Sequence, residues 1–247
     1  HLGLEHRVKF DQLFRANLDL LSQHQYDIGS CTFPPVHIDT YPGVTCQDQP
    51  RGYSPEERKV MWEYINNLLA AGIVEETEVE SPWNHNINLV GKSNDGSQKL
   101  DRSGHGMTRK EMLVKHGAHF CSDLRNVNSS LPEVKLTSLP KFLEVVPLLT
   151  GKTLATFDIR AGYFSVNMDE ESKNIFAFQL DNRYFRYAKL VQGFKNSVAI
   201  FNNLMSRVFS RSAWEKYRVQ HASLRHIPFE QTFSIYLDDL IIAAPDL

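Results

Sequence analysis

The sequence has few cysteines and no long apolar run. Its three cysteines, Cys31, Cys46 and Cys121, are too few and too scattered for a disulfide framework, so we expect a reducing, intracellular and cytoplasmic setting. No run approaches the roughly 20 apolar residues that a transmembrane helix needs, and we therefore expect no membrane partner. The amino terminus is not a signal peptide. The chain also lacks an initiating Met, which suggests a piece cut from a longer polypeptide.

Several catalytic patterns are also missing. The 247 residues contain no glycine-rich phosphate loop, no Ser-His-Asp arrangement and no internal repeat. The formal net charge of −2 gives no general basic field for nucleic acid, although seven Lys and Arg residues outnumber four Asp and Glu residues between Lys92 and Arg125. A local basic face therefore stays open, and the apolar content of 42% is typical of a soluble globular protein.

Two adjacent carboxylates lie at the tip of a predicted β-hairpin. Tyr236-Leu237-Asp238-Asp239 separates the apolar runs Phe233-Ser234-Ile235 and Leu240-Ile241-Ile242, a pattern typical of two short strands joined by a tight turn. Adjacent acids at the end of a buried hairpin repel each other and lose hydration unless a multivalent cation neutralises them. The residues alone are equally compatible with an ordinary exposed turn.

A second predicted strand supplies a third acid. Residues 153–158 form an apolar, β-prone run that ends at Asp158, and the pattern breaks at Gly162. Asp158, Asp238 and Asp239 together would provide three hard oxygen ligands, which Mg²⁺ prefers. We therefore predict a divalent-metal site where this strand meets the hairpin.

The clearest predicted helix begins after Ser54. Ser54 and Glu57 form a capping box, Pro55 occupies the first helical position, and an apolar stripe runs on to Gly72. Apolar spacing predicts further helices within residues 1–23 and 197–209, and the first of these leads into an irregular, proline-containing strand around residues 33–38. Residues 91–117 are polar and contain several glycines, which predicts an exposed loop. Residues 210–231 form a long connection before the hairpin.

The acidic segments resemble, in this order, the three successive palm motifs of a reverse transcriptase. The first is Asp158 with Gly162-Tyr163, the second is residues 190–197 around Gln192-Gly193, and the third is the Tyr236–Asp239 tetrapeptide. The likeness is strongest to the Pol polyproteins of gypsy-type long-terminal-repeat retrotransposons (metaviruses), with retroviruses further off. Three upstream segments resemble the fingers of the same enzymes: Ser81-Pro82-Trp83, residues 89–92 and residues 120–128.

The resemblance covers the chain from about Ile38 to Ala244 and implies an α+β right-hand polymerase fold, with a mainly antiparallel sheet and helices packed on one face. It divides the chain into an N-terminal segment (1–52), fingers (53–150, with an inserted loop at about 93–117) and palm (151–247). Thumb, connection and ribonuclease H regions would lie outside these residues. The implied partners are an RNA or DNA template-primer, deoxynucleoside triphosphates and the rest of a Pol polyprotein, including integrase, within virus-like particles.

The resemblance also implies a reaction and its catalytic residues. Such enzymes extend a primer 3′-hydroxyl with two divalent ions about 3.5–4 Å apart, so positioning and electrostatics dominate the chemistry. The implied catalytic and metal-binding residues are Asp158 and Asp238 as the bridging pair, with Asp239 supporting. The ions would be Mg²⁺, with Mn²⁺ as an alternative.

Five residues are implied in nucleotide binding. Tyr163 would exclude a ribose 2′-hydroxyl, with a core tyrosine as the alternative, and Gln192-Gly193 would bring a polar side chain and close backbone to the nucleotide. Lys92 would meet the triphosphate, with a solvated loop lysine as the alternative. His119 stands where the resembled enzymes carry an arginine. Asp123, Arg125 and Asn128 are expected to hold the fingers sheet together.

Three alternatives remain open at this stage. The substitution at His119, the long insertions and the missing thumb favour a non-catalytic, degenerate or domesticated nucleic-acid-binding remnant. An RNA-dependent RNA polymerase uses similar acids, but Tyr163 and Gln192-Gly193 argue against it. The spacing of His105, His116, His119 and Cys121 invites a zinc site, although it matches no common structural site and lies in a glycine-rich segment.

Overall fold

The computed structural model describes residues 3–91, 118–134, 153–220, 233–236 and 239–244. In these residues every ladder between named strands is antiparallel, as predicted. One sheet has the order β1-β6-β5, built from Val74–Thr77, Arg183–Tyr187 and Ala177–Leu180. A second has the order β4-β8-β7, built from Thr153–Asp158, Asp239–Ala244 and Phe233–Tyr236. A two-stranded ribbon pairs β2 (Asn86–Gly91) with β3 (Ala118–Asp123).

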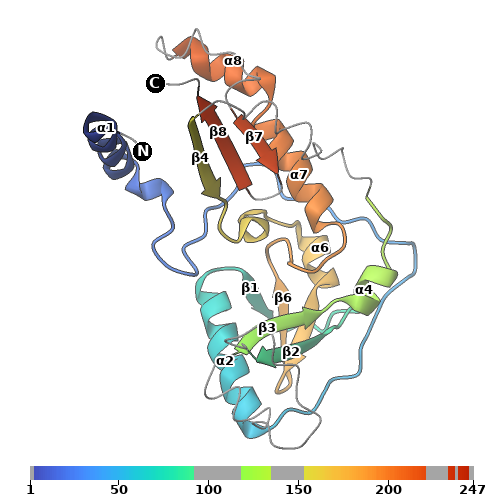
Figure 1. The fold of residues 1–247 in the computed structure, drawn as a ribbon. Coiled ribbons are helices and arrows are strands. Elements are labelled where there is room, and N and C mark those ends of the chain that lie inside the picture. Colours follow the sequence, from blue (N-terminus) through green and yellow to red (C-terminus); the bar gives the residue numbers. More distant parts are fainter. Residues whose placement is uncertain (1–2, 92–117, 135–152, 221–232, 237–238, 245–247) are drawn as a thin grey trace, which may run out of the picture.

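The two three-stranded sheets lie in different parts of the molecule (Figure 1). The sheet β4-β8-β7 lies with α7 (Ser197–Val208) and α8 (Arg211–Gln220), and β1, β6 and the ribbon lie with α2 (Pro55–Ala70) and α4 (Arg125–Ser129). Between them are the 3₁₀ helix η2 (Gly162–Ser165) and α6 (Glu170–Ile175). Because β1 precedes residue 150 and β6 follows it, the sheet β1-β6-β5 joins strands from both sides of the predicted boundary at that residue.

Helix α2 confirms its predicted start. The Ser54 side chain accepts from the Glu57 backbone N–H, the Glu57 carboxylate accepts from the Ser54 N–H, and Pro55 is the first residue of the helix. Met61, Ile65 and Leu68 are buried from its apolar stripe, and Gly72 ends the helix region with a φ of +63°. This positive φ suits glycine, which has no Cβ to clash.

The core brings together residues that lie far apart in the sequence. Its largest fully buried side chains include Phe176, Phe178 and Phe185, which lie in or beside β5 and β6. The Phe185 ring contacts Trp62 of α2. Helix α7, also predicted, adds Phe201, Leu204 and Met205 to the same apolar cluster. The sheet β1-β6-β5 is therefore the centre of the apolar core.

The N-terminal region has its predicted helix but departs from its prediction in the strand that follows. Helix α1 (Leu4–Ala16), followed by the 3₁₀ helix η1 (Leu18–Leu20), confirms the predicted helix and buries no residue. The expected strand at residues 33–38 is not formed. In its place Val36 makes only an isolated parallel bridge with Met168. Two prolines at positions 34 and 35 lack the N–H groups that a ladder needs, which explains the absence.

The long connection after α7 contains a helix that the sequence pattern did not predict. Trp214 and Tyr217 of α8 line an apolar groove together with Leu240 and Ile242 of β8, so α8 lies against the sheet that carries the acids. The predicted inserted loop at 93–117 lies outside the described residues. No helix among those that the structure describes has the length and apolarity to cross a membrane.

Candidate functional site

Two of the three predicted carboxylates meet across a β-ladder. Asp158 is the last residue of β4, Asp239 is the first residue of β8, and their Cα atoms are register partners. Both side chains are exposed. The pairing confirms the predicted strand and the predicted hairpin, and it brings together acids that lie 81 positions apart in the numbering.

The hairpin itself has the tight form that its sequence predicts. Tyr236 of β7 pairs with Asp239 of β8, so only Leu237 and Asp238 separate the partners. These two residues lie outside the described part of the chain, and the place of Asp238 beside Asp158 stays a prediction. Among the described residues, no group of three or more His, Cys, Asp or Glu side chains forms a ready metal site.

Tyr163 is held from one side by an aromatic ring of α7. Its ring and that of Phe201 have centroids 5.3 Å apart with a near-perpendicular angle of 72°. The preceding Gly162 is buried, and a Cβ built on it would lie 2.6 Å from Cζ of Phe201. Ala161 adopts the left-handed conformation with a φ of +49°, an uncommon state for a residue with a Cβ. The turn after Asp158 is therefore closely fitted against α7.

The segment around Gln192 is fastened on both flanks and exposed at its tip. Val191 and Phe194 are buried, and the Phe194 ring contacts Phe176 edge-on at 5.0 Å. Gln192 and Gly193 are exposed, and Gly193 has a φ of +88°. Because the left-handed region strongly favours glycine, Gly193 allows the turn that brings Phe194 back into the core.

Asp123 and Arg125 form the expected local support of the β2-β3 ribbon. Arg125 donates to Asp123 through Nε and Nη2 at 2.7 Å each, and Arg51 adds a contact at 3.3 Å. The Arg125 guanidinium holds the pKa of the Asp123 carboxyl below its usual range. Asn128 differs from this expectation, since its side chain bonds to the backbone of Gly193 and Lys195 and not to the sheet.

Of the remaining predicted residues, only His119 is described, and it lies on the ribbon. His119 is exposed on β3 opposite Val90, and Lys92, which follows Gly91 at the end of β2, lies outside the described residues. The ribbon is separated from the sheet β4-β8-β7 by η2 and α6 in Figure 1. Of the four residues of the alternative zinc site, the structure describes only His119 and Cys121. The Cys121 Sγ lies 3.8 Å from the His119 carbonyl oxygen.

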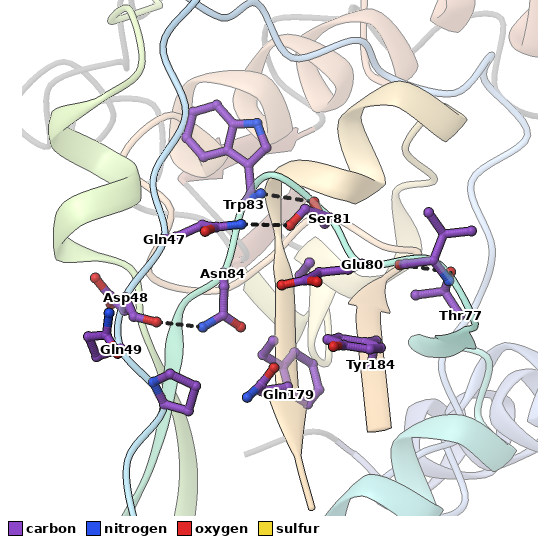
Figure 2. A pocket seen from close by; sticks show the side chains of 14 residues that line it. Gln47, Asp48, Gln49, Thr77, Glu80, Ser81, Trp83, Asn84, Gln179 and Tyr184 are labelled. Carbon is purple, nitrogen blue, oxygen red and sulfur yellow. Dashed lines mark hydrogen bonds between the residues drawn. The ribbon is translucent and has the colours of Figure 1, made fainter. Parts of the chain in front are cut away.

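A polar pocket beside Trp83 had no signal in the sequence. Figure 2 shows Gln47, Glu80, Gln179 and Tyr184 around it, from the N-terminal segment, the turn after β1 and the strands β5 and β6. Gln47 donates to the Ser81 carbonyl and Asn84 donates to the Asp48 carbonyl, so the Ser-Pro-Trp segment is tied to the N-terminal segment. The pocket forms where segments far apart in the sequence come together, so local sequence patterns do not predict it.

Comparison with known proteins decides the family. The model of the family "Reverse transcriptase (RNA-dependent DNA polymerase)" matches residues 114–247, more than half of the chain. The chain belongs to the reverse transcriptase family. Within it, the chain is of the type found in retroviral and retroelement Pol polyproteins, as the following relatives illustrate.

The curated relatives are much longer than this chain. The sequence is 27% identical over 218 residues to the Gag-Pol polyprotein of avian reticuloendotheliosis virus, covering 85% of this chain and 15% of that protein. It is 28% identical over 221 residues to the Pol polyprotein of feline endogenous virus ECE1, covering 87% and 17%. It is 22% identical over 195 residues to the enzymatic polyprotein of figwort mosaic virus (strain DxS), covering 78% and 24%.

The fold agrees with that of a solved reverse transcriptase. The foamy viral protease-reverse transcriptase in complex with an RNA/DNA hybrid superposes with a TM-score of 0.72 at 19% sequence identity. The superposition covers 100% of this chain and 28% of that protein. The mixed helical and antiparallel architecture is therefore a reverse transcriptase fold.

Proposed function

We propose that this chain forms the fingers and palm of an RNA-directed DNA polymerase, which extends a primer 3′-hydroxyl on an RNA or DNA template with deoxynucleoside triphosphates. The observation that carries the proposal is the register pairing of Asp158 with Asp239 in a chain of the reverse transcriptase family. The pairing supplies exposed carboxylates from two distant segments at one point of a sheet. Nucleotidyl transfer needs this concentration of negative charge to hold divalent cations.

Asp158, Asp238 and Asp239 would hold two Mg²⁺ ions, with Mn²⁺ as an alternative. Asp158 and Asp239, the two acids that the structure describes, are suitable ligands for Mg²⁺ because this ion prefers carboxylate oxygens. Their exposure leaves room for water and substrate phosphates. When bound, the ions lower the pKa of the attacking hydroxyl and neutralise charge on the leaving pyrophosphate. The pairing of β4 with β8 fixes the backbones of Asp158 and Asp239 side by side, which supports a site formed before substrate arrives.

Tyr163 and Gln192 would select and orient the incoming nucleotide. The contact of Tyr163 with Phe201 supports a role as a fixed wall, because the ring is half-buried and backed by α7. A wall beside the sugar would exclude a 2′-hydroxyl. Gln192 and Gly193 would present one amide side chain and an approachable backbone to the nucleotide. Lys92 and His119 would meet its triphosphate, and His119 pairs with Val90 near the end of the ribbon.

We further propose the finer context of the chain. Residues 53–150 would form fingers and residues 151–247 palm, joined through the β1-β6 pairing. The parent would be a gypsy-type Pol polyprotein that also carries thumb, ribonuclease H and integrase regions and works within cytoplasmic virus-like particles. The motif order in the sequence supports this context.

The decisive test is primer extension on an RNA template with Mg²⁺ and deoxynucleoside triphosphates. The unsubstituted chain should extend the primer, and Asp158→Asn, Asp238→Asn and Asp239→Asn should each lower or abolish incorporation. Asp19→Asn is a matched control, because Asp19 is an exposed acid of η1, which belongs to neither the sheet nor the hairpin. Circular dichroism should show all four variants folded.

The outcomes separate the proposal from its alternative. Full extension by Asp158→Asn would remove this acid from the chemistry. Binding of template-primer with no extension by any chain would instead support the non-catalytic remnant. A third result, efficient ribonucleotide incorporation by the unsubstituted chain, would support an RNA polymerase and contradict the wall assigned to Tyr163.

A further inference from the structure

The segment from Val191 to Ser197 is fixed along nearly its whole length. Ser197, the first residue of α7, donates its hydroxyl to the Val191 carbonyl at 2.6 Å in a buried contact. Phe194 is packed in the core against Phe176, and Asn196 is only 3% exposed. Local contacts thus close the segment into a compact loop ahead of α7.

A second set of contacts joins this loop to the segment after α4. Asn196 donates its amide to the Pro132 carbonyl at 2.9 Å and accepts from the Val134 N–H at 3.1 Å. Lys195 donates its ammonium group to the Leu131 carbonyl at 2.6 Å. Because these bonds connect side chains to backbone, they fix the position of the loop as well as its shape.

Asn128 completes the attachment at the tip of the loop. Its Nδ2 donates to the Gly193 carbonyl at 3.0 Å, and its Oδ1 accepts from the Lys195 N–H at 2.9 Å. One planar amide therefore bridges the backbone on both sides of Phe194. The bridge restrains the left-handed Gly193, which directly follows Gln192.

The side chain of Gln192 is available to bind a ligand. Its side chain is exposed and makes no hydrogen bond with any residue that the structure describes. The neighbours on either side are anchored by burial or by the Asn128 bridge. A rigid loop that carries one unengaged amide loses little conformational freedom when that amide binds a ligand.

We propose that Asn128 is a positioning residue, which fixes Gln192 for contact with the incoming nucleotide. The inference rests on the proposed function, and it adds a residue that touches neither nucleotide nor metal. Without the bridge, Gly193 regains its backbone freedom and Gln192 samples orientations that do not contact the nucleotide. The consequence is weaker productive nucleotide binding, with the metal-binding carboxylates unaffected.

The test is steady-state incorporation on an RNA template by the unsubstituted chain and by Asn128→Ala. The KM for the deoxynucleotide should rise roughly 10- to 100-fold, with kcat changed much less, because orientation is lost while the catalytic groups stay. Asn126→Ala is the matched control. Asn126 lies on the same helix α4, but its amide bonds to Asp48 at 2.6 Å and not to the loop.

A double-mutant cycle distinguishes positioning from general structural support. In a Gln192→Ala background, Asn128→Ala should raise KM by no more than about twofold, because the side chain to be positioned is gone. Amide hydrogen exchange should also be faster at Lys195 in Asn128→Ala, since that N–H loses its acceptor. This second readout does not depend on polymerase activity.

Each outcome has one meaning. An unchanged KM in Asn128→Ala, or an equal rise with and without Gln192, would overturn the positioning role while leaving the proposed function intact. Absence of primer extension by the unsubstituted chain would instead overturn the proposed function and this inference with it. A KM rise confined to chains that retain Gln192 supports both.

Discussion

The two three-stranded sheets share an antiparallel order but differ in what they do with their surfaces. In β1-β6-β5, Phe178 and Phe185 are almost completely buried and stack on each other with ring centroids 5.4 Å apart. In β4-β8-β7, Leu154 is 47% exposed and Ile242 is 36% exposed. The same architecture therefore serves burial in one sheet and the presentation of Asp158 and Asp239 in the other.

Polar contacts strengthen the difference. Arg186 of β6 joins Glu75 of β1 at 2.6 Å and Glu170 of α6 at 2.7 Å. Lys173 of α6 reaches the same two carboxylates. This partly buried network ties the sheet to α6, whereas the acids of the other sheet have no cationic partner among the described residues. Carboxylates without a cationic partner are costly for stability and can hold cations, so the comparison contrasts a sheet that stabilises the fold with the sheet that carries the proposed metal-binding acids.

The largest expected effect tests the buried sheet. Phe185→Ala should lower the free energy of unfolding by about 3–5 kcal/mol, because it removes a fully buried aromatic ring and leaves a cavity between Trp62 and Phe178. Urea unfolding followed by circular dichroism measures the change. Asp158→Asn is the counterpart in the other sheet and should leave that free energy nearly unchanged. Equal losses in the two variants would contradict the division of roles.

The next effect is a pH dependence that comes from His85. His85 is 1% exposed, its ring contacts those of Phe178 and Tyr187, and neither of its ring nitrogens has a hydrogen-bond partner among the described residues. Burial lowers the pKa of His85 to about 4 from its ordinary value of 6.5, and the Ala177 carbonyl and the Asp123 charge only partly oppose it. The imidazole therefore stays neutral in the folded protein down to about pH 4.

The sign of the effect follows from proton binding. Between pH 6.5 and about 4 the unfolded chain binds a proton at this residue and the folded chain does not, so stability falls as the pH is lowered through that range. The total loss is on the order of 3 kcal/mol. Unfolding midpoints in urea at pH 7 and pH 5 should differ less in His85→Leu than in the unsubstituted chain. An identical pH dependence in both would show that His85 does not titrate as described.

Elements with strong local signals were predictable from the sequence. The capping box at Ser54 and Glu57 and the short turn between Tyr236 and Asp239 depend on neighbouring residues, so the pattern alone predicts helix α2 and the hairpin. Helix α1 was predicted as well, but its exposure was not, because apolar spacing reports a face and not whether a partner covers it. Helix α8 gave no clear signal, since its sequence is mostly polar.

In the candidate site, too, features that depend on neighbouring residues were predictable and features that depend on distant contacts were not. Asp158 and Asp239 were predictable because each ends or begins a strand with a strong β pattern. The contact of Gly162 with Phe201 and the bridge from Asn128 to Gly193 were not, because each joins residues far apart in the chain. Nothing in a window of neighbouring residues records such a contact. Residue identity suggests the chemistry that we propose, and tertiary contacts determine the geometry of the residues that would perform it.

A smaller effect is expected where the site borders α7. Gly162→Ala would place a Cβ 2.6 Å from Cζ of Phe201, so either that ring or η2 must shift. Overpacking of this kind costs about 1–3 kcal/mol. Because Tyr163 follows directly and packs on the same ring, discrimination between deoxynucleotides and ribonucleotides should weaken together with stability. Single-nucleotide incorporation with both sugars measures the discrimination.

A second substitution makes that prediction specific. Phe201→Leu shortens the side chain that the new methyl group meets, so the Gly162→Ala, Phe201→Leu double variant should recover part of the lost stability. Tyr163→Ala should admit ribonucleotides without the packing strain. Unchanged sugar discrimination in Tyr163→Ala would show that the ring contacts α7 alone and forms no wall beside the nucleotide.

The smallest effect belongs to the outer surface of the sheet that carries the acids. Leu154 lies on β4, four residues before Asp158, and its side chain is nearly half exposed. Leu154→Thr keeps a β-favouring residue while removing exposed apolar surface, so the free energy of unfolding should change by less than about 0.5 kcal/mol. Primer extension should also be unaffected, because Asp158 keeps its register with Asp239. A loss of 2 kcal/mol or more, measured in urea, would mean that this face contributes to the core as β1-β6-β5 does. The contrast between a sheet for stability and a sheet for chemistry would then fail.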